Sequence, residues 1–304
     1  MSDIKTVLRD IGGILIIIGF VSLIALAIPI FFGEYGSSSG FDGIAPLLIT
    51  SAVFFVVGVP LYLLFKHAEL ANFKTAMVTA AIGWLIISII GSIPFWLIPF
   101  DTGSLLIMDP LSGFFESMSG WTGTGLTMVD NEAMLPYTLQ FWRSLIQWVG
   151  GVGVIVLTLS ILARPGTGSY VLYKGEARDQ KTHPSIISTV RTIWWIFLLY
   201  TIIGIVALMM IGWIEGPSLG MNPWQSLNHA MTAIATGGFS VTDDSVTFFG
   251  VASQIMIILL MILGAIAFAA HYDLLKGRIR KFLSDSQFKA MIAVSYTHLT
   301  LPTN

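Results

Sequence analysis

Six long apolar segments decide what this chain can fold into. They cover residues 11–32, 43–65, 75–100, 144–163, 192–214 and 245–270, and none of them contains Asp, Glu, Lys or Arg. A helix needs about 20 predominantly apolar residues to cross a bilayer core of ~30 Å. Each segment is therefore predicted to be a transmembrane helix.

The composition favours the same class of protein. Hydrophobic residues make up 55% of the chain, charged residues make up 11%, and the mean hydropathy is +0.83. About a quarter of the residues of a soluble domain are charged, so this chain cannot cover a water-facing surface. The sequence has no cysteine, which excludes disulfides and thiolate metal sites. We expect an all-α membrane protein without a cleavable signal peptide and without a nucleic-acid partner.

The basic residues indicate how the spans are oriented. If the six spans alternate in direction, almost every Lys and Arg outside them falls on one side. These residues are Lys5, Arg9, Lys66, Lys74, Arg164, Lys174, Arg178, Lys181, Arg191, Lys276, Arg278, Arg280, Lys281 and Lys289. Cytoplasmic loops of membrane proteins carry such an excess. We expect a multi-pass protein of the plasma membrane with both ends of this chain in the cytoplasm, and Arg143 is the exception to the rule.

Two polar segments between the spans match each other at a constant offset. Positions 110 and 223 are Pro, 118 and 231 are Met, 125 and 238 are Gly, and 130 and 243 are Asp, so the spacing within every pair is the same. A fixed period indicates a duplicated structural unit. Each unit reads as a span, a half-helix, a Gly/Thr-rich loop and a second span. The half-helix and loop are too short to cross the bilayer, so they are predicted to enter and leave it on one side.

The Gly/Thr-rich loops have the composition of an ion pathway. Irregular backbone at membrane depth is tolerated only where it is buried in protein or lines a watery cavity. Carbonyl oxygens along such a cavity replace the hydration shell of a potassium ion, and the C-terminal end of a half-helix favours a cation. Glycine takes the φ values that turn successive carbonyls inward. Ordinary external loops are the alternative reading, which two loops in the same register make less attractive.

These considerations select the candidate site residues. We predict potassium-binding positions at Thr122, Gly123, Thr124, Gly125, Thr236, Gly237 and Gly238. We predict that the loops are supported by Glu116, Thr127, Asn228 and Ser240.

Four further features lie outside the loops. Arg143 is expected to pair with an outer acid such as Asp130 or Glu132, or to extend to lipid headgroups. His229 is expected to be a packed, hydrogen-bonded residue rather than a ligand, and His271 is expected at the membrane interface. The run of glycines at positions 150, 151 and 153 predicts close packing of the fourth span on a neighbour.

Three sequence stretches resemble a known family. Residues 114–127 (FFESMSGWTGTGLT) and 141–151 (FWRSLIQWVGG) resemble the first pore unit of the TrkH/KtrB potassium transporters, the Trk/Ktr/HKT family. Residues 235–240 (ATGGFS) resemble the second filter of that family, and the two extra N-terminal spans resemble its TrkH branch. The resemblance covers roughly residues 75 to 281.

The resemblance implies channel-like potassium uptake that needs no cofactor beyond the transported ion. It implies four pore units around one pore, each with one key filter glycine, which would be Gly125 and Gly238 here. It also implies a homodimer and a cytoplasmic nucleotide-binding regulatory subunit similar to TrkA. Leu126 and Phe239 depart from the pattern of potassium channels, which leaves a pathway permeable to both Na⁺ and K⁺ open.

The resemblance also divides the chain. Residues 1–70 are expected to form an extra two-helix domain, 71–175 the first pore unit, 176–284 the second, and 285–294 the start of a third. Residues 295–304 turn abruptly polar and are expected to be a non-native tail. We expect the chain to be the N-terminal part of a longer protein.

Two other functions are compatible with a membrane protein of this size. A complete two-unit channel that dimerises to supply four loops is one alternative. An intramembrane enzyme or a coupled secondary transporter is the other. An enzyme would need paired acids, a His cluster or a Ser/base pair inside the spans, which hold none, and coupled transporters usually carry inverted repeats. We therefore expect no enzymatic activity.

Overall fold

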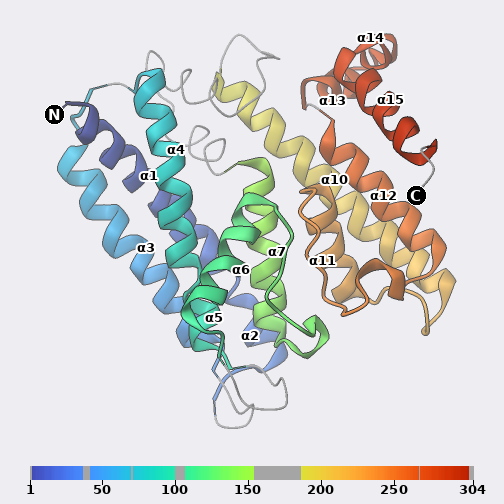
Figure 1. The fold of residues 1–304 in the computed structure, drawn as a ribbon, viewed down its shortest axis with the longest axis horizontal. Helices are drawn as coiled ribbons and strands as arrows, with labels where there is room; N and C mark the ends of the chain where they lie inside the picture. The colour runs from blue at the N-terminus through green and yellow to red at the C-terminus, as the bar shows by residue number, and fades with distance from the viewer. Residues whose placement is uncertain are drawn as a thin grey trace.

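The computed structural model of the chain describes residues 2–36, 42–69, 71–99, 107–153, 186–266 and 268–300. Every regular element in these ranges is helical, so the all-α membrane fold expected from the sequence is confirmed (Figure 1). The elements are α1 (Ser2–Ile24), α2 (Ala27–Phe32), α3 (Ile44–Phe65), α4 (Phe73–Gly91), α5 (Ile93–Leu97), α6 (Pro110–Thr122), η1 (Glu132–Met134), α7 (Tyr137–Val152), α10 (Ile186–Glu215), α11 (Pro223–Ile234), η2 (Ser245–Phe248), α12 (Val251–Ala265), α13 (Phe268–Leu275), α14 (Ile279–Ser284) and α15 (Ser286–Thr300).

Four helical segments of the described ranges are long and apolar enough to cross a membrane. They are Asp3–Phe32, Ile44–Phe65, Lys74–Leu97 and Arg191–Glu215. They correspond to the first, second, third and fifth predicted spans. Large apolar side chains such as Val56, Leu64 and Trp213 are exposed on these helices. Such side chains suit contact with lipid, because a helix satisfies its own backbone hydrogen bonds there.

The fourth and sixth predicted spans have different bounds in the structure. Helix α7 begins at Tyr137, upstream of the predicted start at residue 144, because Arg143 is buried inside the bundle rather than placed at a boundary. Residues 154–163 of that prediction lie outside the described residues. Helix α12 begins at Val251 because Ser245–Phe248 form a separate 3₁₀ turn, and it ends at Ala265 because Ile266 is extended.

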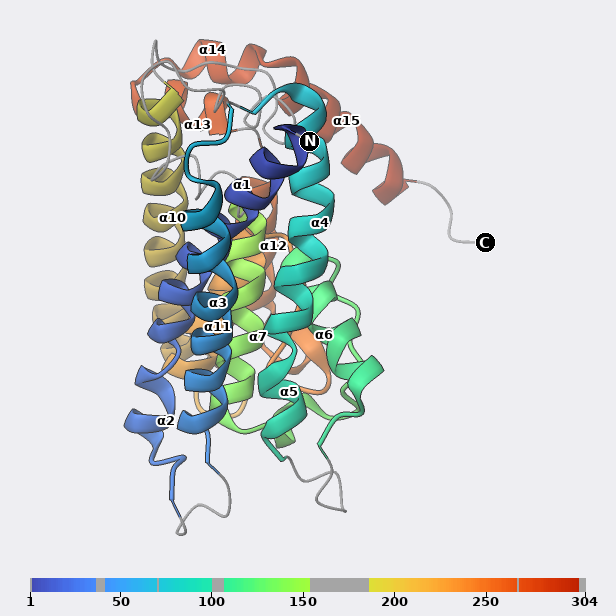
Figure 2. The ribbon, with the colours of Figure 1, turned by 90° about the vertical axis from the view of Figure 1, so that its left-hand side faces the viewer.

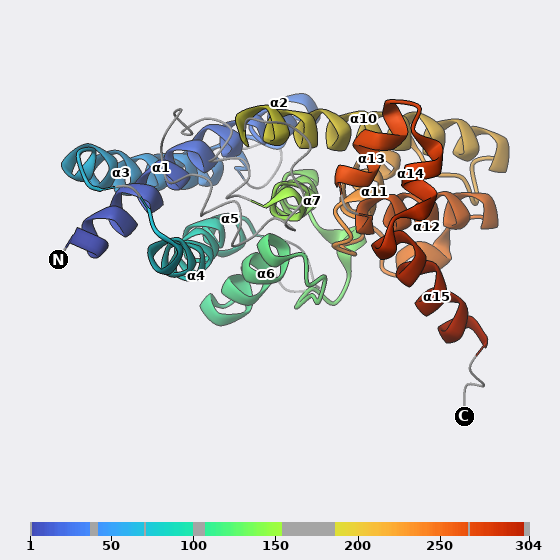
Figure 3. The same ribbon diagram turned by 90° about the horizontal axis from the view of Figure 1, so that it is seen from above.

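The helices form three groups that lie side by side when the bundle is seen from above (Figure 3). Helices α1 and α3 form one end, α4 to α7 the middle, and α10 to α12 the other end. Gly12 and Gly58 allow α1 and α3 to touch at the backbone, since a Cβ on Gly58 would lie 3.0 Å from the carbonyl oxygen of Gly12. Helix α7 packs against both α6 and α11 and therefore joins the two repeat units.

The third span is broken where it passes α6 (Figure 2). Helix α4 ends at Gly91 and α5 begins at Ile93, one residue before Pro94, which cannot donate a backbone hydrogen bond. The indole Nε1 of Trp142 donates to the carbonyl oxygen of Gly91 at 2.9 Å. That bond fixes α7 to the break.

A polar side chain caps the start of each half-helix. Asp109 caps α6 by accepting hydrogen bonds from the backbone N–H groups of Leu111 (3.0 Å) and Ser112 (3.1 Å). Asn222 and Gln225 form a reciprocal capping box at the start of α11. Each helix carries proline at its first position. With 13 and 12 residues, α6 and α11 are too short to cross a bilayer.

Candidate ion-binding site

The two half-helices end in the same hydrogen-bonded motif. At the end of α6, the N–H of Gly123 donates to Gly120 O (3.0 Å) and the N–H of Thr124 donates to Ser119 O (2.9 Å). At the end of α11, the N–H of Thr236 donates to Ala233 O (2.9 Å), and that of Gly237 to Thr232 O (2.9 Å). Both sets have the pattern of a Schellman motif.

The backbone dihedrals repeat at the offset that relates the two sequence segments. Positive φ angles occur at Gly123 (66°) and Gly125 (79°) in the first loop, and at Thr236 (54°) and Gly238 (87°) in the second. The motif places its left-handed residue at Gly123 in one unit and at Thr236 in the other. The left-handed backbone conformation is costly for threonine, as it is for other L-residues with a Cβ atom. The second loop therefore holds a strained backbone that its surroundings must enforce.

Glycine at position 237 has a different reason from the one predicted. Its φ is not in the left-handed region, and a Cβ there would overlap the side-chain oxygen of Gln147. Glycine at 237 therefore allows the Gln147 amide to approach the loop backbone closely. The positive φ angle expected at Gly237 occurs at Thr236 instead.

The two loops meet each other. A Cβ on Gly125 would overlap the carbonyl oxygen of Gly237, and it would lie 3.6 Å from the Cα of Gly238. The glycines singled out in the two repeats therefore lie at one place in the fold, although they are far apart in sequence. The C-terminal ends of α6 and α11 both lead into this place, and each brings the negative end of its helix dipole.

The loop hydroxyls supply further oxygen atoms. Thr122 Oγ1 donates to Met118 O at 2.7 Å and lies 2.7 Å from Thr124 Oγ1. Thr122, Thr124 and Thr236 are exposed in the described chain. None of residues 122–127 or 236–240 carries a charge. The site therefore presents neutral oxygen ligands, which suit an alkali cation.

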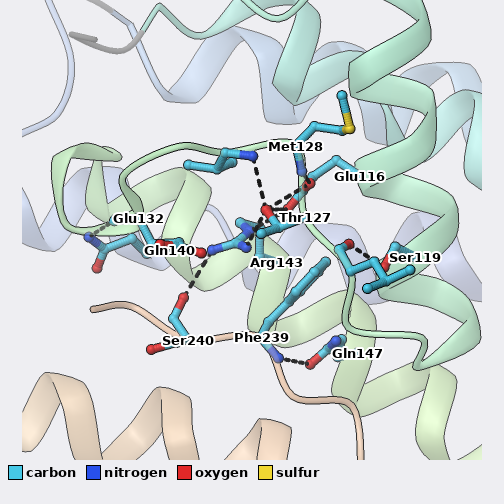
Figure 4. A network of polar contacts seen from close by, with 12 residues as sticks. Glu116, Ser119, Thr127, Met128, Glu132, Gln140, Arg143, Gln147, Phe239 and Ser240 are labelled. Carbon is cyan, nitrogen blue, oxygen red and sulfur yellow. Dashed lines mark hydrogen bonds and ion pairs between the residues drawn. The ribbon is translucent and has the colours of Figure 1, made fainter. Parts of the chain in front are cut away.

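Glu116 contacts the first loop from within α6 (Figure 4). Its carboxylate accepts hydrogen bonds from the backbone N–H of Met128 at 2.8 Å and from Thr127 Oγ1 at 3.0 Å. The side chain is fully buried. Ser119, one turn further along α6, donates to Leu126 O at 2.5 Å. These bonds hold residues 126–128, the second half of the loop, against α6.

The expectation for Arg143 is wrong. This side chain reaches neither Asp130 nor Glu132, nor does it extend to the headgroups, because it is 1% exposed and its Nε lies 2.7 Å from Glu116 Oε1. Its Nη2 donates to Thr127 Oγ1 at 3.0 Å. Its Nη1 donates to Ser240 O of the second loop at 2.9 Å (Figure 4). One guanidinium on α7 therefore ties the two loops together.

The second loop has its own support, made by His229. Nε2 of His229 lies 3.1 Å from Ser240 Oγ, and Nδ1 lies 2.9 Å from Gln225 O. His229 and Ser240 are the repeat equivalents of Glu116 and Thr127, so the same contact recurs with different chemistry. Asn228, the predicted support, instead donates to Trp224 O within α11. His229 is buried, as expected for a packed histidine.

Helix α7 contacts the second loop at two more places. Gln147 Oε1 accepts a hydrogen bond from the N–H of Phe239 at 3.0 Å, and the guanidinium carbon of Arg143 lies 4.2 Å from the Phe239 ring centroid. A Cβ on Gly150 would overlap Trp121 O of α6, and one on Gly151 would lie 2.7 Å from Ala235 Cβ. The close packing predicted for these glycines is therefore against both half-helices.

His271 is packed inside the described chain. It is fully buried, its Nδ1 lies 3.1 Å from the Tyr200 hydroxyl, and its Nε2 lies 2.8 Å from Leu263 O. It therefore joins the segment after the break at Ile266 to α10 and α12. Across the described ranges, no group of three or more His, Cys, Asp or Glu side chains could hold a metal ion.

The comparisons with known proteins agree on one family. The sequence profile of TrkH, described as a cation transport protein, matches residues 45–300. The chain belongs to the TrkH family. It is 37% identical over 293 residues to an uncharacterized cation transporter of Methanocaldococcus jannaschii, which covers 96% of this chain and 56% of that protein. It is 34% identical over 227 residues to the Trk system potassium uptake protein TrkH of Escherichia coli. That alignment covers 72% of this chain and 44% of the Escherichia coli protein.

A solved structure supports the assignment of the TrkH fold. The crystal structure of the potassium transporter TrkH from Vibrio parahaemolyticus superposes with a TM-score of 0.72 at 25% identity, over 97% of this chain and 57% of that one. The chain therefore spans about half the length of the relatives that it matches.

The sequence did not predict the loop contacts that Arg143, Gln147 and His229 make in this TrkH-family chain. Arg143 and Gln147 stand four residues apart and Gly150 and Gly151 follow one turn later, so all lie on one face of α7. That spacing was available in the sequence and pointed to a helix face directed at the loops. The role of His229 was available from the repeat offset, because position 116 maps onto 229 and not onto 228.

Proposed function

We propose that this chain forms part of a channel-like pathway that carries potassium across the plasma membrane. The observation that carries the proposal is the meeting of two Gly-rich loops of equivalent conformation, where Gly125 faces the carbonyl of Gly237. The names of the bacterial relatives, Trk system potassium uptake proteins, support potassium as the ion.

The ion would be held by neutral oxygens. Carbonyl groups and hydroxyls of Thr122, Gly123, Thr124, Gly125, Thr236, Gly237 and Gly238 would replace its hydration shell. The C-terminal ends of α6 and α11 would stabilise its charge. Because the loops carry no fixed charge, the ion would bind weakly enough to leave. An inside-negative membrane potential would drive uptake at ~2.3 kcal/mol per charge per 100 mV.

The supporting residues would keep the oxygens at the right spacing. In the first loop these are Glu116 and Thr127, and in the second they are His229 and Ser240, with Arg143 joining the two. Asn228 would act only inside α11. A rigid frame matters because a loop that collapses around a smaller ion loses the distinction between potassium and sodium.

The wider organisation would follow that of the family. Residues 1–70 would form the extra helix pair, 71–175 and 176–284 the two pore units, 285–294 the start of a third, and 295–304 a non-native tail. Both ends of this chain would lie in the cytoplasm, where the basic segments gather. The working protein would be a homodimer regulated by a cytoplasmic nucleotide-binding subunit.

Isotopic flux tests the proposal directly. The protein expressed from its native open reading frame, reconstituted in liposomes, should take up labelled Rb⁺ faster than labelled Na⁺ when the lumen is made negative. It should also restore growth at low potassium to a strain that lacks potassium uptake. Equal Rb⁺ and Na⁺ flux would favour a pathway permeable to both ions, and no flux of either would overturn the proposal.

A further inference from the structure

We propose that Glu34, at the tip of the N-terminal helix pair, is a positioning residue for the ion-binding loops. The inference rests on the proposed function, because it assigns a role in cation discrimination to a residue that does not touch the loops. It makes the N-terminal pair a working part of the first pore unit rather than an appendage to it.

The Glu34 carboxylate caps the start of α7. Its Oε1 accepts a hydrogen bond from the backbone N–H of Tyr137 at 2.7 Å, and its Oε2 accepts from the N–H of Thr138 at 2.8 Å. The Thr138 hydroxyl donates a third bond to Oε2 at 2.6 Å. Glu34 is 8% exposed, and its negative charge faces the positive end of the α7 dipole. Three hydrogen bonds and the helix dipole therefore hold this carboxylate at the start of α7.

In the second pore unit a carboxylate caps the start of α12 in the same way, but this acid belongs to the unit itself. Glu215, the last residue of α10, accepts hydrogen bonds from the N–H groups of Ala252 (2.9 Å) and Ser253 (3.2 Å) at the start of α12. The Ser253 hydroxyl donates to Oε2 of Glu215 at 2.6 Å, as that of Thr138 does to Glu34. In both units a buried hydroxyl and two backbone N–H groups bind one carboxylate. Only in the first unit does that carboxylate come from outside the unit.

An aromatic cluster extends the contact to the second half-helix. The Phe32 ring stacks on Tyr137 with centroids 4.0 Å apart, and it meets Trp224 of α11 edge-on at 4.9 Å. The Trp224 indole donates to Gln140 Oε1 of α7 at 2.6 Å. The segment from Phe32 to Glu34 therefore contacts both the second span of the first unit and the half-helix of the second, at the bottom of Figure 1.

Helix α7 transmits this anchoring to the loops. Arg143 lies less than two helical turns after Tyr137, and Gln147 lies one turn further on. These two side chains bond the first loop at Thr127 and the second at Ser240 and Phe239. A helix moves as a rigid rod over this distance, so loosening its first turn displaces the guanidinium relative to both loops.

Charge-matched variants of the protein from its native open reading frame test the inference. Glu34→Gln places an amide N–H against a backbone donor and should lower the Rb⁺/Na⁺ flux ratio by roughly threefold or more. Asp42→Asn is the matched control. Asp42 lies in the same external segment and also caps a helix, accepting from Ile44 N at 2.8 Å, but that helix is α3 and the side chain is exposed. The control should keep the wild-type ratio.

Each outcome decides a separate point. No Rb⁺ flux in the wild-type protein would overturn the proposed function. A selective wild type with an equally selective Glu34→Gln variant would overturn only the role of Glu34. Equal losses in Glu34→Gln and Asp42→Asn would also overturn it, since a general effect of external charge would then suffice. If Glu34→Gln does not fold, Thr138→Val decides, because it removes only one bond to Glu34: an unchanged ratio would overturn the inference, and a reduced ratio would support it.

Discussion

The carboxylate of Glu116 and the guanidinium of Arg143 form an ion pair at 2.7 Å in which neither side chain is more than 1% exposed. Both carboxylate oxygens and both Nη atoms of the pair have further hydrogen-bond partners among residues 127, 128 and 240. A buried pair of this kind costs desolvation energy, and it is tolerated where the geometry is good and the remaining groups are bonded. Because the pair is hydrogen-bonded to both loops, we infer that it fixes their position relative to each other.

Removing one partner should be far worse than removing both. Arg143→Leu leaves the Glu116 carboxylate buried without a counter-charge, and the loss should be about 3–5 kcal/mol of unfolding free energy. The double variant Glu116→Gln/Arg143→Leu should recover part of that loss, because no charge is then left unpaired. Thermal unfolding of the purified single and double variants in detergent measures the coupling. Strictly additive losses would show that the pair is not energetically connected.

The contact between Gly125 and Gly237 predicts an unusually intolerant position. Gly125→Ala introduces a Cβ that overlaps the carbonyl oxygen of Gly237, and it also strains a φ of 79°. Gly277→Ala is the matched control, because Gly277 has a φ of 72° but nothing within 4 Å of its Cβ position. Each variant should lose ~1–2 kcal/mol to backbone strain, but only Gly125→Ala should abolish Rb⁺ flux. Gly125→Asp should abolish it as well.

An active Gly125→Ala protein with normal discrimination would argue against a binding site at the meeting of the loops. A Gly277→Ala protein that also lost flux would show that strain alone explains the effect. Rb⁺ flux, normalised to the amount of folded protein in the liposomes, is the measurement in both cases.

The Asp109 cap predicts that the stability of the first turn of α6 decreases at acid pH. The pKa of Asp109 lies below its ordinary value of 3.8, because Ser112 and the N–H groups at the start of α6 donate hydrogen bonds to its carboxylate. A carboxyl whose pKa is lower in the folded state stabilises that state at pH values above its unfolded pKa, and this contribution fades as the pH falls through the folded pKa. The protection factors of the amides in the first turn of α6 against hydrogen exchange should therefore fall progressively as the pH drops below the ordinary aspartate pKa of 3.8. Asp109→Asn keeps an acceptor for these N–H groups and should remove the acid dependence, so an unchanged dependence in this variant would point to another group.

The sequence predicts some parts of this molecule well, for physical reasons that are local. Length and hydropathy identify the long spans, and Asp109 with Pro110 identifies the start of α6, because caps act within one turn. The constant offset between the two polar segments identifies both loops, because equivalent loops need equivalent glycines. These signals are contained in short stretches of chain.

Other features depend on contacts between distant segments. The hydropathy of α7 placed Arg143 at a membrane boundary, whereas its partners Glu116, Thr127 and Ser240 come from two other segments and make burial of the charge acceptable. The role of Glu34 is hidden for the same reason, since Tyr137 is far away along the chain. No local pattern distinguishes a capping acid from an ordinary loop acid when the helix that it caps is remote.

The repetition of the support in both units predicts that the two loops respond alike when it is removed. Thr127→Val deletes the hydroxyl that joins Glu116 and Arg143, and Ser240→Ala deletes the one that joins His229 to the second loop. Each variant should lose about 1 kcal/mol of stability. Each should also lower the Rb⁺/Na⁺ flux ratio, and Thr127→Val should lower it more because its hydroxyl also binds Arg143. Thr50→Val is the control, since it removes a fully buried hydroxyl that bonds only Pro46 O within α3. A similar loss of discrimination in Thr50→Val would mean that the ratio reports general stability, whereas an effect confined to Thr127→Val and Ser240→Ala would assign it to the loop supports.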